Sequence, residues 1–152
     1  MVKLTVLMDN NTFVDQYYTA EPALSYHIEN GGSSFLFDAG YSDAYLRNAE
    51  KMGIDWKCWK TIIISHGHAD HTWGLIPLFQ RYVEEAMKKK PLTKPTLLAH
   101  PETFRSKWED HMELGFNLTH DSLNRVFDLQ LERDPMHLTD KLVYLGEIPR
   151  RN

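Results

Sequence analysis

The sequence predicts a single layered domain of the α/β or α+β class. Segments with the two-residue alternation of strands are interleaved, through the middle of the chain, with segments whose apolar residues recur at helical spacing. No internal repeat, low-complexity tract or Ser/Gly-rich linker divides the 152 residues, so one domain over residues 1–152 is expected. Hydrophobic residues make up 42% of the chain, which is enough to bury a core.

The N-terminal part is expected to form three strands, over Val2–Met8, Leu24–Glu29 and Ser34–Asp38. In the first of them Val2, Leu4 and Val6 share one face, which is the pattern of a half-buried strand. An Asn-Gly-Gly sequence between the second and third strands can supply a tight hairpin turn. A short amphipathic helix follows, with an N-cap at Ser42 and a stop at Gly53.

Thr61–Ser65 is a continuous run rich in β-branched residues, typical of a strand that is covered on both faces. After a loop that begins at His66, helical spacing resumes over Leu75–Met87, and Lys88-Lys89-Lys90 places cations at the negative end of that helix. The remaining expected elements are a strand over Thr96–Ala99, a helix from Pro101 to about Trp108, and short strands over Val126–Gln130 and Leu142–Leu145.

Composition excludes several functional classes. Lys and Arg number 17 against 21 Asp and Glu, a net charge of −4, and this mild acidity argues against nucleic-acid binding. No apolar run approaches the roughly 18 residues of a membrane span, and the N-terminus lacks the pattern of a secretory leader, so a cytoplasmic protein is expected. The lone cysteine, Cys58, excludes an internal disulfide and a cysteine-based zinc cluster.

The segment His66-Gly67-His68-Ala69-Asp70-His71 carries the chemistry. Side chains two residues apart on extended backbone point the same way, so His66 and His68 can bind one cation, while Asp70 and His71 can offer an oxygen and a nitrogen beside it. Imidazole and carboxylate ligands suit one or two Zn²⁺ ions, and Mn²⁺ or Fe²⁺ are alternatives. The competing interpretation is a polar surface loop. Metal ligation implies metal-assisted hydrolysis, with Asp70 as a ligand or as the group that orients the attacking water.

This loop, with Thr72, Gly74 and Leu75 after it, resembles the defining loop of the metallo-β-lactamase-fold hydrolases. Phe37-Asp38-Ala39-Gly40 resembles the Asp-Thr-Gly that precedes the loop in that superfamily, with Ala39 departing at the middle position. Other segments are similar to a narrower branch, the dihydropterin ribofuranosylaminobenzene phosphate synthase-like proteins: Asp9-Asn10-Asn11-Thr12, Leu24-Ser25, Ala99-His100-Pro101 and Leu145-Gly146-Glu147-Ile148-Pro149-Arg150.

The resemblance implies the N-terminal half of an αββα sandwich, that is, a mixed sheet covered by helices. It also implies a metal centre at the edge of the sandwich, with His66, His68, Asp70 and His71 as ligands, and a small phosphate-bearing or otherwise anionic substrate. Pterin-phosphate transfer would be a related activity.

Three further residues have roles that stay open. The resemblance places Asp38 beside the loop, where its carboxylate could accept the second N–H of a ligand histidine; the alternative is a residue that forms the turn at a strand end. His100 ends a strand as His66 does, which suits a substrate-facing donor, a third ligand or a hydrogen-bonded structural histidine. His27 lies in an alternating strand and is expected to be half-exposed.

The number of ligands is too small for an autonomous catalytic site. A catalytic zinc takes three protein ligands and a water, whereas the loop offers four ligands for as many as two ions. The resemblance places the other ligands in a half that would follow Arg151-Asn152. We therefore expect a homodimer or a separate C-terminal-half chain to complete the site. The alternatives are a truncated, catalytically silent metal-binding half-domain and a module that binds one zinc only for stability.

Overall fold

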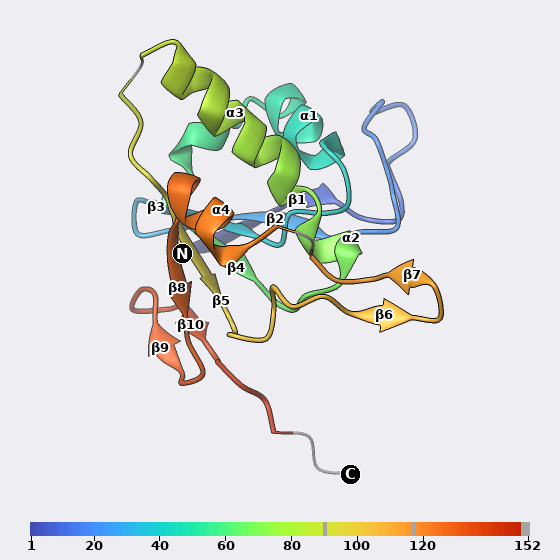
Figure 1. Ribbon diagram of the computed structural model, residues 1–152. Coiled ribbons are helices and arrows are strands. Elements are labelled where there is room, and N and C mark those ends of the chain that lie inside the picture. Colours follow the sequence, from blue (N-terminus) through green and yellow to red (C-terminus); the bar gives the residue numbers. More distant parts are fainter. Residues whose placement is uncertain (90, 117, 150–152) are drawn as a thin grey trace.

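The computed structural model describes residues 1–89, 91–116 and 118–149, and its centre is a six-stranded mixed sheet (Figure 1). The sheet has the order β1-β2-β3-β4-β5-β8, with the first three strands antiparallel and the last four parallel. Its strands are β1 (Val2–Met8), β2 (Ser25–Asn30), β3 (Ser33–Phe37), β4 (Thr61–Ile64), β5 (Thr96–Ala99) and β8 (Asp128–Leu131). The expected α/β class with a mixed sheet is confirmed.

Helices cover one face of this sheet (Figure 1). They are α1 (Ala44–Lys51), the 3-10 helix η1 (Trp56–Cys58), α3 (Leu75–Met87) and α4 (His120–Val126), while the short α2 (Ala69–Thr72) lies at the sheet edge. The spacing of apolar residues predicts α1 and α3 because each needs one apolar stripe toward the sheet. The N-cap of α1 is Asp43 rather than Ser42, although the Ser42 hydroxyl accepts a hydrogen bond from the Ala44 backbone N–H.

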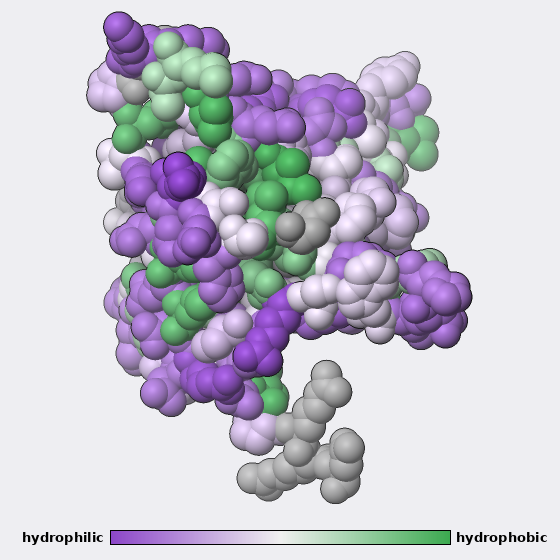
Figure 2. All heavy atoms as spheres, in the orientation of Figure 1, coloured by the Kyte–Doolittle hydropathy of each residue, from purple (hydrophilic) through white to green (hydrophobic). Residues whose placement is uncertain are grey.

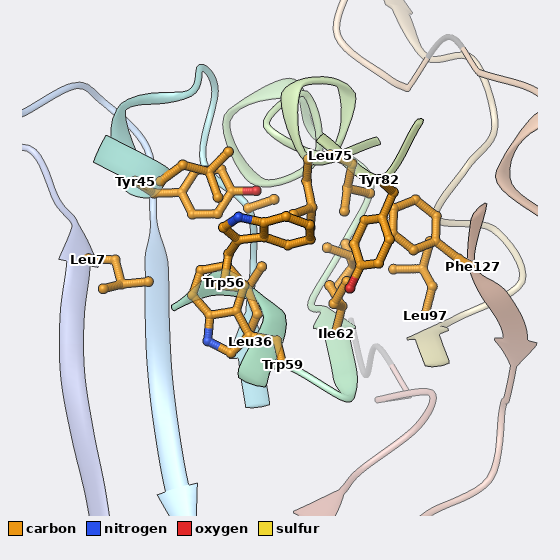
Figure 3. Packing of buried hydrophobic residues seen from close by; sticks show 14 of the residues in the cluster. Leu7, Leu36, Tyr45, Trp56, Trp59, Ile62, Leu75, Tyr82, Leu97 and Phe127 are labelled. Atoms are coloured by element: carbon orange, nitrogen blue, oxygen red, sulfur yellow. The ribbon is translucent and has the colours of Figure 1, made fainter. Parts of the chain in front are cut away.

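The main core lies between the helices and the sheet (Figure 3). Leu36, Ile62 and Leu97 come from neighbouring strands and are fully buried under Leu75 of α3. Aromatic rings fill the wider gaps, as where Trp59 stacks on Tyr45 with ring centroids 6.1 Å apart. Alternate residues of the short strands thus bury one continuous apolar layer, which supplies most of the driving force for folding.

The opposite face is only partly covered. Phe35, Ile63 and Leu98 point to this side and pack under a hairpin of β9 (Met136–His137) and β10 (Val143–Tyr144). A cavity of about 320 Å³ remains between this hairpin and the sheet. The row Val2, Leu4 and Val6, which the alternation predicts to be the buried face of its strand, lies on this face and is 40%, 52% and 43% exposed, so that expectation is wrong.

Two C-terminal expectations differ from the structure. The segment from Pro101 to Trp108 is a turn rather than a helix, followed by a hairpin of β6 (Trp108–Glu109) and β7 (Met112–Glu113). Three of its carbonyl groups accept hydrogen bonds from the Lys107 ammonium, and the Lys107 backbone N–H donates to the Glu113 carboxylate instead of to the carbonyl four residues back, as it would in a helix. Thr119 caps α4, which the sequence patterns do not predict.

The face of the molecule seen in Figure 2 carries an apolar groove beside α3. Apolar side chains remain visible among hydrophilic ones along α3, where a groove of about 530 Å³ separates α3 from α4 (Figure 2). No helix within the described ranges is both long and apolar enough to cross a membrane. Two residues of the sequence analysis lie outside the described residues: Lys90 of the lysine run and Arg150 of the segment that begins at Leu145.

Candidate metal centre

The candidate site lies where three parallel strands end. Asp38 follows β3, Ser65 and the histidine loop follow β4, and His100 follows β5. Because β3, β4 and β5 pair in parallel, their carboxyl ends meet at one edge of the sheet. This pairing brings Asp38, His66 and His100 to one edge, although 28 and 34 positions separate them along the chain.

Asp38 is the buried acceptor at the centre of this edge. Its Oδ1 accepts the Ser65 backbone N–H at 2.7 Å, and its Oδ2 accepts the Ser65 hydroxyl and His71 Nδ1, each at 2.7 Å. The backbone of Asp38 has φ of 54°, a left-handed conformation that Asp adopts more readily than most residues. The hydrogen bonds to Ser65 and His71 offset the cost of that conformation and of burying a carboxylate.

These bonds assign the protons of two histidine rings. The Ser65 hydroxyl donates its only proton to Asp38, so its oxygen accepts from His66 Nδ1–H at 2.9 Å. His71 Nδ1–H likewise donates to Asp38. In both rings the lone pair is therefore on Nε2, which is the state a metal ligand needs.

The potential ligands form two pairs. His66 Nε2 and His68 Nδ1 are 3.2 Å apart, and Asp70 Oδ2 and His71 Nε2 are 3.3 Å apart. Two nitrogens on one tetrahedral zinc, each at about 2.0–2.1 Å from the ion, lie about 3.3 Å from each other. The His66 and His71 rings approach to 4.1 Å between centroids, which brings the two pairs together.

Each pair falls short of a full coordination shell. Among the described residues, no group of three or more His, Cys, Asp or Glu side chains is placed so as to hold a metal ion. The donor types and the spacing within each pair fit two ligands of a divalent cation, and the remaining ligands are not supplied by this part of the chain.

The electrostatics differ between the two histidines that face each other. Burial lowers the pKa of His66, and the neighbouring His71 and His68 lower it further, so its ring favours the neutral form that can ligate a cation. The hydrogen bond to Asp38 raises the pKa of His71. A bound cation would take the place of the second proton, which His71 carries on Nε2 when its ring is charged.

Backbone bonds hold the loop against the turn after β3. Ala39 N–H donates to the His71 carbonyl at 2.9 Å, and Gly74 N–H donates to the Gly40 carbonyl at 3.1 Å. A Cβ on Gly74 would lie only 1.8 Å from the Ala39 carbonyl oxygen, so no other residue allows this close approach. The resemblance of both segments to one family thus corresponds to a direct contact between them.

A family model described as the metallo-beta-lactamase superfamily matches residues 18–149. The chain belongs to this superfamily. Its members are generally metal-dependent hydrolases. The expected relationship and the expected fold are both confirmed.

Comparison with individual relatives shows what share of their length this chain matches. Two proteins of Methanocaldococcus jannaschii match 97% of this chain: the uncharacterized protein MJ0448, at 28% identity, and a 7,8-dihydropterin-6-methyl-4-(beta-D-ribofuranosyl)-aminobenzene-5'-phosphate synthase, at 29%. This chain covers 54% and 51% of them. The crystal structure of Tm1679, a metal-dependent hydrolase of the beta-lactamase superfamily, matches 96% of this chain and 48% of its own, with a TM-score of 0.72 and 24% identity. The chain thus spans about half the length of these relatives.

His100 lies on the same edge but uses its nitrogens elsewhere. It lines, together with Ser65, His66 and Lys107, a cavity of about 610 Å³. Its Nδ1 accepts the Glu102 backbone N–H at 3.2 Å, and its Nε2 lies 3.2 Å from Arg133 Nη1 and 3.5 Å from a Glu147 carboxylate oxygen. Arg133 joins this group with a 2.7 Å bond to Glu147. The structure therefore places His100 in a polar network on the cavity wall, outside the two ligand pairs.

Sequence reasoning missed two residues that contact the predicted site residues at this edge of the sheet. The Ser65 hydroxyl bonds to both Asp38 and His66. Its position directly before the first histidine could have marked it as a site residue. Arg133 is 33 positions from His100, and nothing in its local sequence indicates that contact. His27, expected to be half-exposed, is 4% exposed and accepts a hydrogen bond from Trp59 Nε1 at 2.9 Å.

Proposed function

We propose that this chain is the metal-binding half of a hydrolase that acts on a small phosphate-bearing or otherwise anionic substrate. In this proposal His66, His68, Asp70 and His71 hold one or two Zn²⁺ ions, with Mn²⁺ or Fe²⁺ as alternatives. The observation that carries it is the pair of separations, 3.2 Å between His66 and His68 nitrogens and 3.3 Å between Asp70 and His71. Both separations also match two donors bound to one tetrahedral ion.

A bound divalent cation would lower the pKa of a water toward 7 and polarise a carbonyl or phosphoryl oxygen of the substrate. The chain's own residues orient the ligands. Asp38 holds the proton of His71 on Nδ1 and, through Ser65, that of His66 on Nδ1. The partly exposed carboxylate of Asp70 serves as a ligand or accepts a proton from the attacking water.

The substrate class is suggested by one relative. The charged groups at the cavity beside His66 do not select a charge, because the Lys107 ammonium donates to three backbone carbonyls and Arg133 pairs with the Glu102 and Glu147 carboxylates. The relative named as an aminobenzene-5'-phosphate synthase makes a phosphorylated product by its name. A phosphate-bearing pterin precursor is the specific substrate that this relationship suggests.

The missing ligands would come from polypeptide beyond these 152 residues, either a C-terminal half or a second copy of the chain. Two donors per pair are fewer than the three protein ligands that catalytic zinc takes. The exposed apolar row of β1 offers a surface on which such a polypeptide could pack.

The test is native mass spectrometry of the protein with Zn²⁺, alone and with a C-terminal-half polypeptide from a relative. We expect metal-bound protein as a dimer or as the complemented pair, and hydrolysis of p-nitrophenyl phosphate, bis(p-nitrophenyl) phosphate or a lactone. His66→Ala should abolish metal binding, whereas His111→Ala, an exposed histidine in a hairpin turn, should not. Wild-type protein that stays free of metal in every state would refute the proposal.

The second candidate is a metal-binding half-domain without catalytic activity. The observation that favours it is the absence of a complete three-ligand group among the described residues. Tight metal binding, with turnover no higher than that of His66→Ala in every assembly state, would support this candidate over the hydrolase.

A further inference from the structure

One segment holds the loop backbone on both sides of His68. Residues 102–115, which include the turn after β5 and the β6–β7 hairpin, contact Gly67 before His68 and Ala69 after it. His68 supplies one nitrogen of the first ligand pair, so the backbone that carries it sets where that nitrogen lies.

On the Gly67 side the contact is steric. A Cβ on Gly67 would lie 2.0 Å from the Thr103 carbonyl oxygen and 2.4 Å from Lys107 Nζ. The Gly67 backbone therefore packs directly on the 102–105 turn, with no room for a side chain between them.

The Lys107 side chain holds that turn in place. Its ammonium donates to the carbonyls of Glu102, Thr103 and Arg105 at 3.0, 3.2 and 3.2 Å. An ammonium has three protons, so all of its donors are used on this one turn. Bonds from a charged donor are stronger than those between neutral groups.

On the Ala69 side the contact is a hydrogen bond. Ala69 N–H donates to the Leu114 carbonyl at 2.8 Å, and Leu114 N–H donates to the Lys107 carbonyl at 2.7 Å. The Glu113 carboxylate accepts the backbone N–H groups of Lys107 and Gly115 at 2.8 and 2.7 Å, which closes the base of the hairpin. Lys107 thus takes part in both contacts, through its side chain on one side and its backbone on the other.

We propose that Lys107 is a positioning residue, whose ammonium fixes the 102–105 turn against Gly67 and thereby sets the position of His68 relative to His66. Its relevance to metal binding rests on the proposed function, but its effect on the loop does not. Without the ammonium, three carbonyls lose their donor and the turn relaxes, which releases the backbone on both sides of His68. Displacing one nitrogen of a pair by a fraction of an ångström weakens a tetrahedral site.

The test compares Lys107→Met with Lys94→Met. Lys94 also donates to a backbone carbonyl, that of Asn124 at 2.8 Å, but lies before β5, at the opposite edge of the sheet. The first readout is hydrogen exchange of the Ala69 amide in metal-free protein, which we expect to accelerate at least about tenfold in Lys107→Met and to stay unchanged in Lys94→Met. The second is Zn²⁺ affinity by competition with a chromophoric chelator, expected to fall about 10- to 100-fold.

An Ala69 amide that exchanges equally fast in both variants and in the wild type would overturn the proposal. Faster exchange with unchanged Zn²⁺ affinity would overturn it too, because His68 would then not depend on the turn. If the wild type binds no Zn²⁺ but Lys107→Met still accelerates exchange, the loop-holding role is supported and the proposed function fails. Should Lys107→Met not fold, Lys107→Gln retains two N–H donors; it should show intermediate exchange, and wild-type exchange in it would contradict the proposal.

Discussion

At the scale of single residues, one carboxylate orders the candidate metal centre. Asp38 accepts His71 Nδ1 directly and reaches His66 through the Ser65 hydroxyl, so a single buried group determines which nitrogen of each ring is free. The sequence places His66, Asp70 and His71 within six residues, and the family resemblance adds Asp38. The relay through Ser65 depends on a strand pairing that brings β3 and β4 side by side, which no local pattern reveals.

Asp38→Asn tests this arrangement, because Asn tolerates the left-handed backbone at φ of 54° but places an NH₂ group opposite Ser65 or His71. We expect Zn²⁺ affinity to fall about 10- to 100-fold and the free energy of unfolding to fall by about 1–3 kcal/mol. Chelator competition and urea denaturation measure the two effects. Asp43→Asn, at an exposed carboxylate, is the control, and equal Zn²⁺ affinity in the two variants would contradict the prediction.

At the scale of elements, strands with clear alternation were predicted well, whereas the segment after β5 was not. Pro101 suits the first turn of a helix, but the Lys107 backbone N–H donates to Glu113 in the following hairpin, and the Lys107 ammonium bonds to the carbonyls of the turn. The burial of His27 in β2 was likewise not predicted, because it depends on a contact with a distant residue. Its strand alternates as expected, yet Trp59, the residue after η1, donates its Nε1–H to the ring, and the ring is buried.

The contact between β2 and Trp59 predicts a pH dependence of stability. Trp59 Nε1–H donates to His27 Nδ1, so that nitrogen is unprotonated, and burial lowers the pKa of His27 from its ordinary value near 6.5. The unfolded chain then binds more protons than the folded chain below about pH 6.5, so stability is lost as the pH falls through that value, by at most about 1.4 kcal/mol per pH unit.

Urea denaturation of metal-free protein between pH 7.5 and 5.5 measures this dependence, with His27→Gln as the reference. Gln offers an oxygen to Trp59 but does not titrate in this range, so the difference between the two proteins isolates His27 from His66 and His71. Parallel pH profiles in the wild type and in His27→Gln would show that His27 makes no contribution.

At the scale of the whole molecule, the two faces of the sheet are covered unequally. Helices cover one face, whereas the β9–β10 hairpin covers only the middle of the other and leaves the row on β1 exposed (Figure 1). An exposed apolar row on an edge strand is a surface for association. The chain spans about half the length of the curated relatives that it matches.

Leu4→Lys tests this surface. Leu4 is 52% exposed, so the substitution should change the free energy of unfolding by no more than about 0.5 kcal/mol, but it should abolish association through this face, because a partner would bury the added charge. Sedimentation velocity, with and without the complementing polypeptide, measures the association. Met87→Lys adds the same charge at the end of α3, on the helical side, and association equally weakened by both variants would refute the assignment.

Short segments of sequence were enough to predict the strands β1 to β5, the helices α1 and α3 and the position of the loop His66–His71, because alternation, helical spacing and motif spacing act over a few residues. The ligand role of that loop stays a prediction. Long-range folding was needed to show the contact of Ser65 with Asp38 and His66, that of His100 with Glu102 and Glu147, and the bonds from Lys107 to three carbonyls of one turn. Those contacts join residues whose proximity depends on strand order and on the path of a turn, and neither leaves a mark in local sequence.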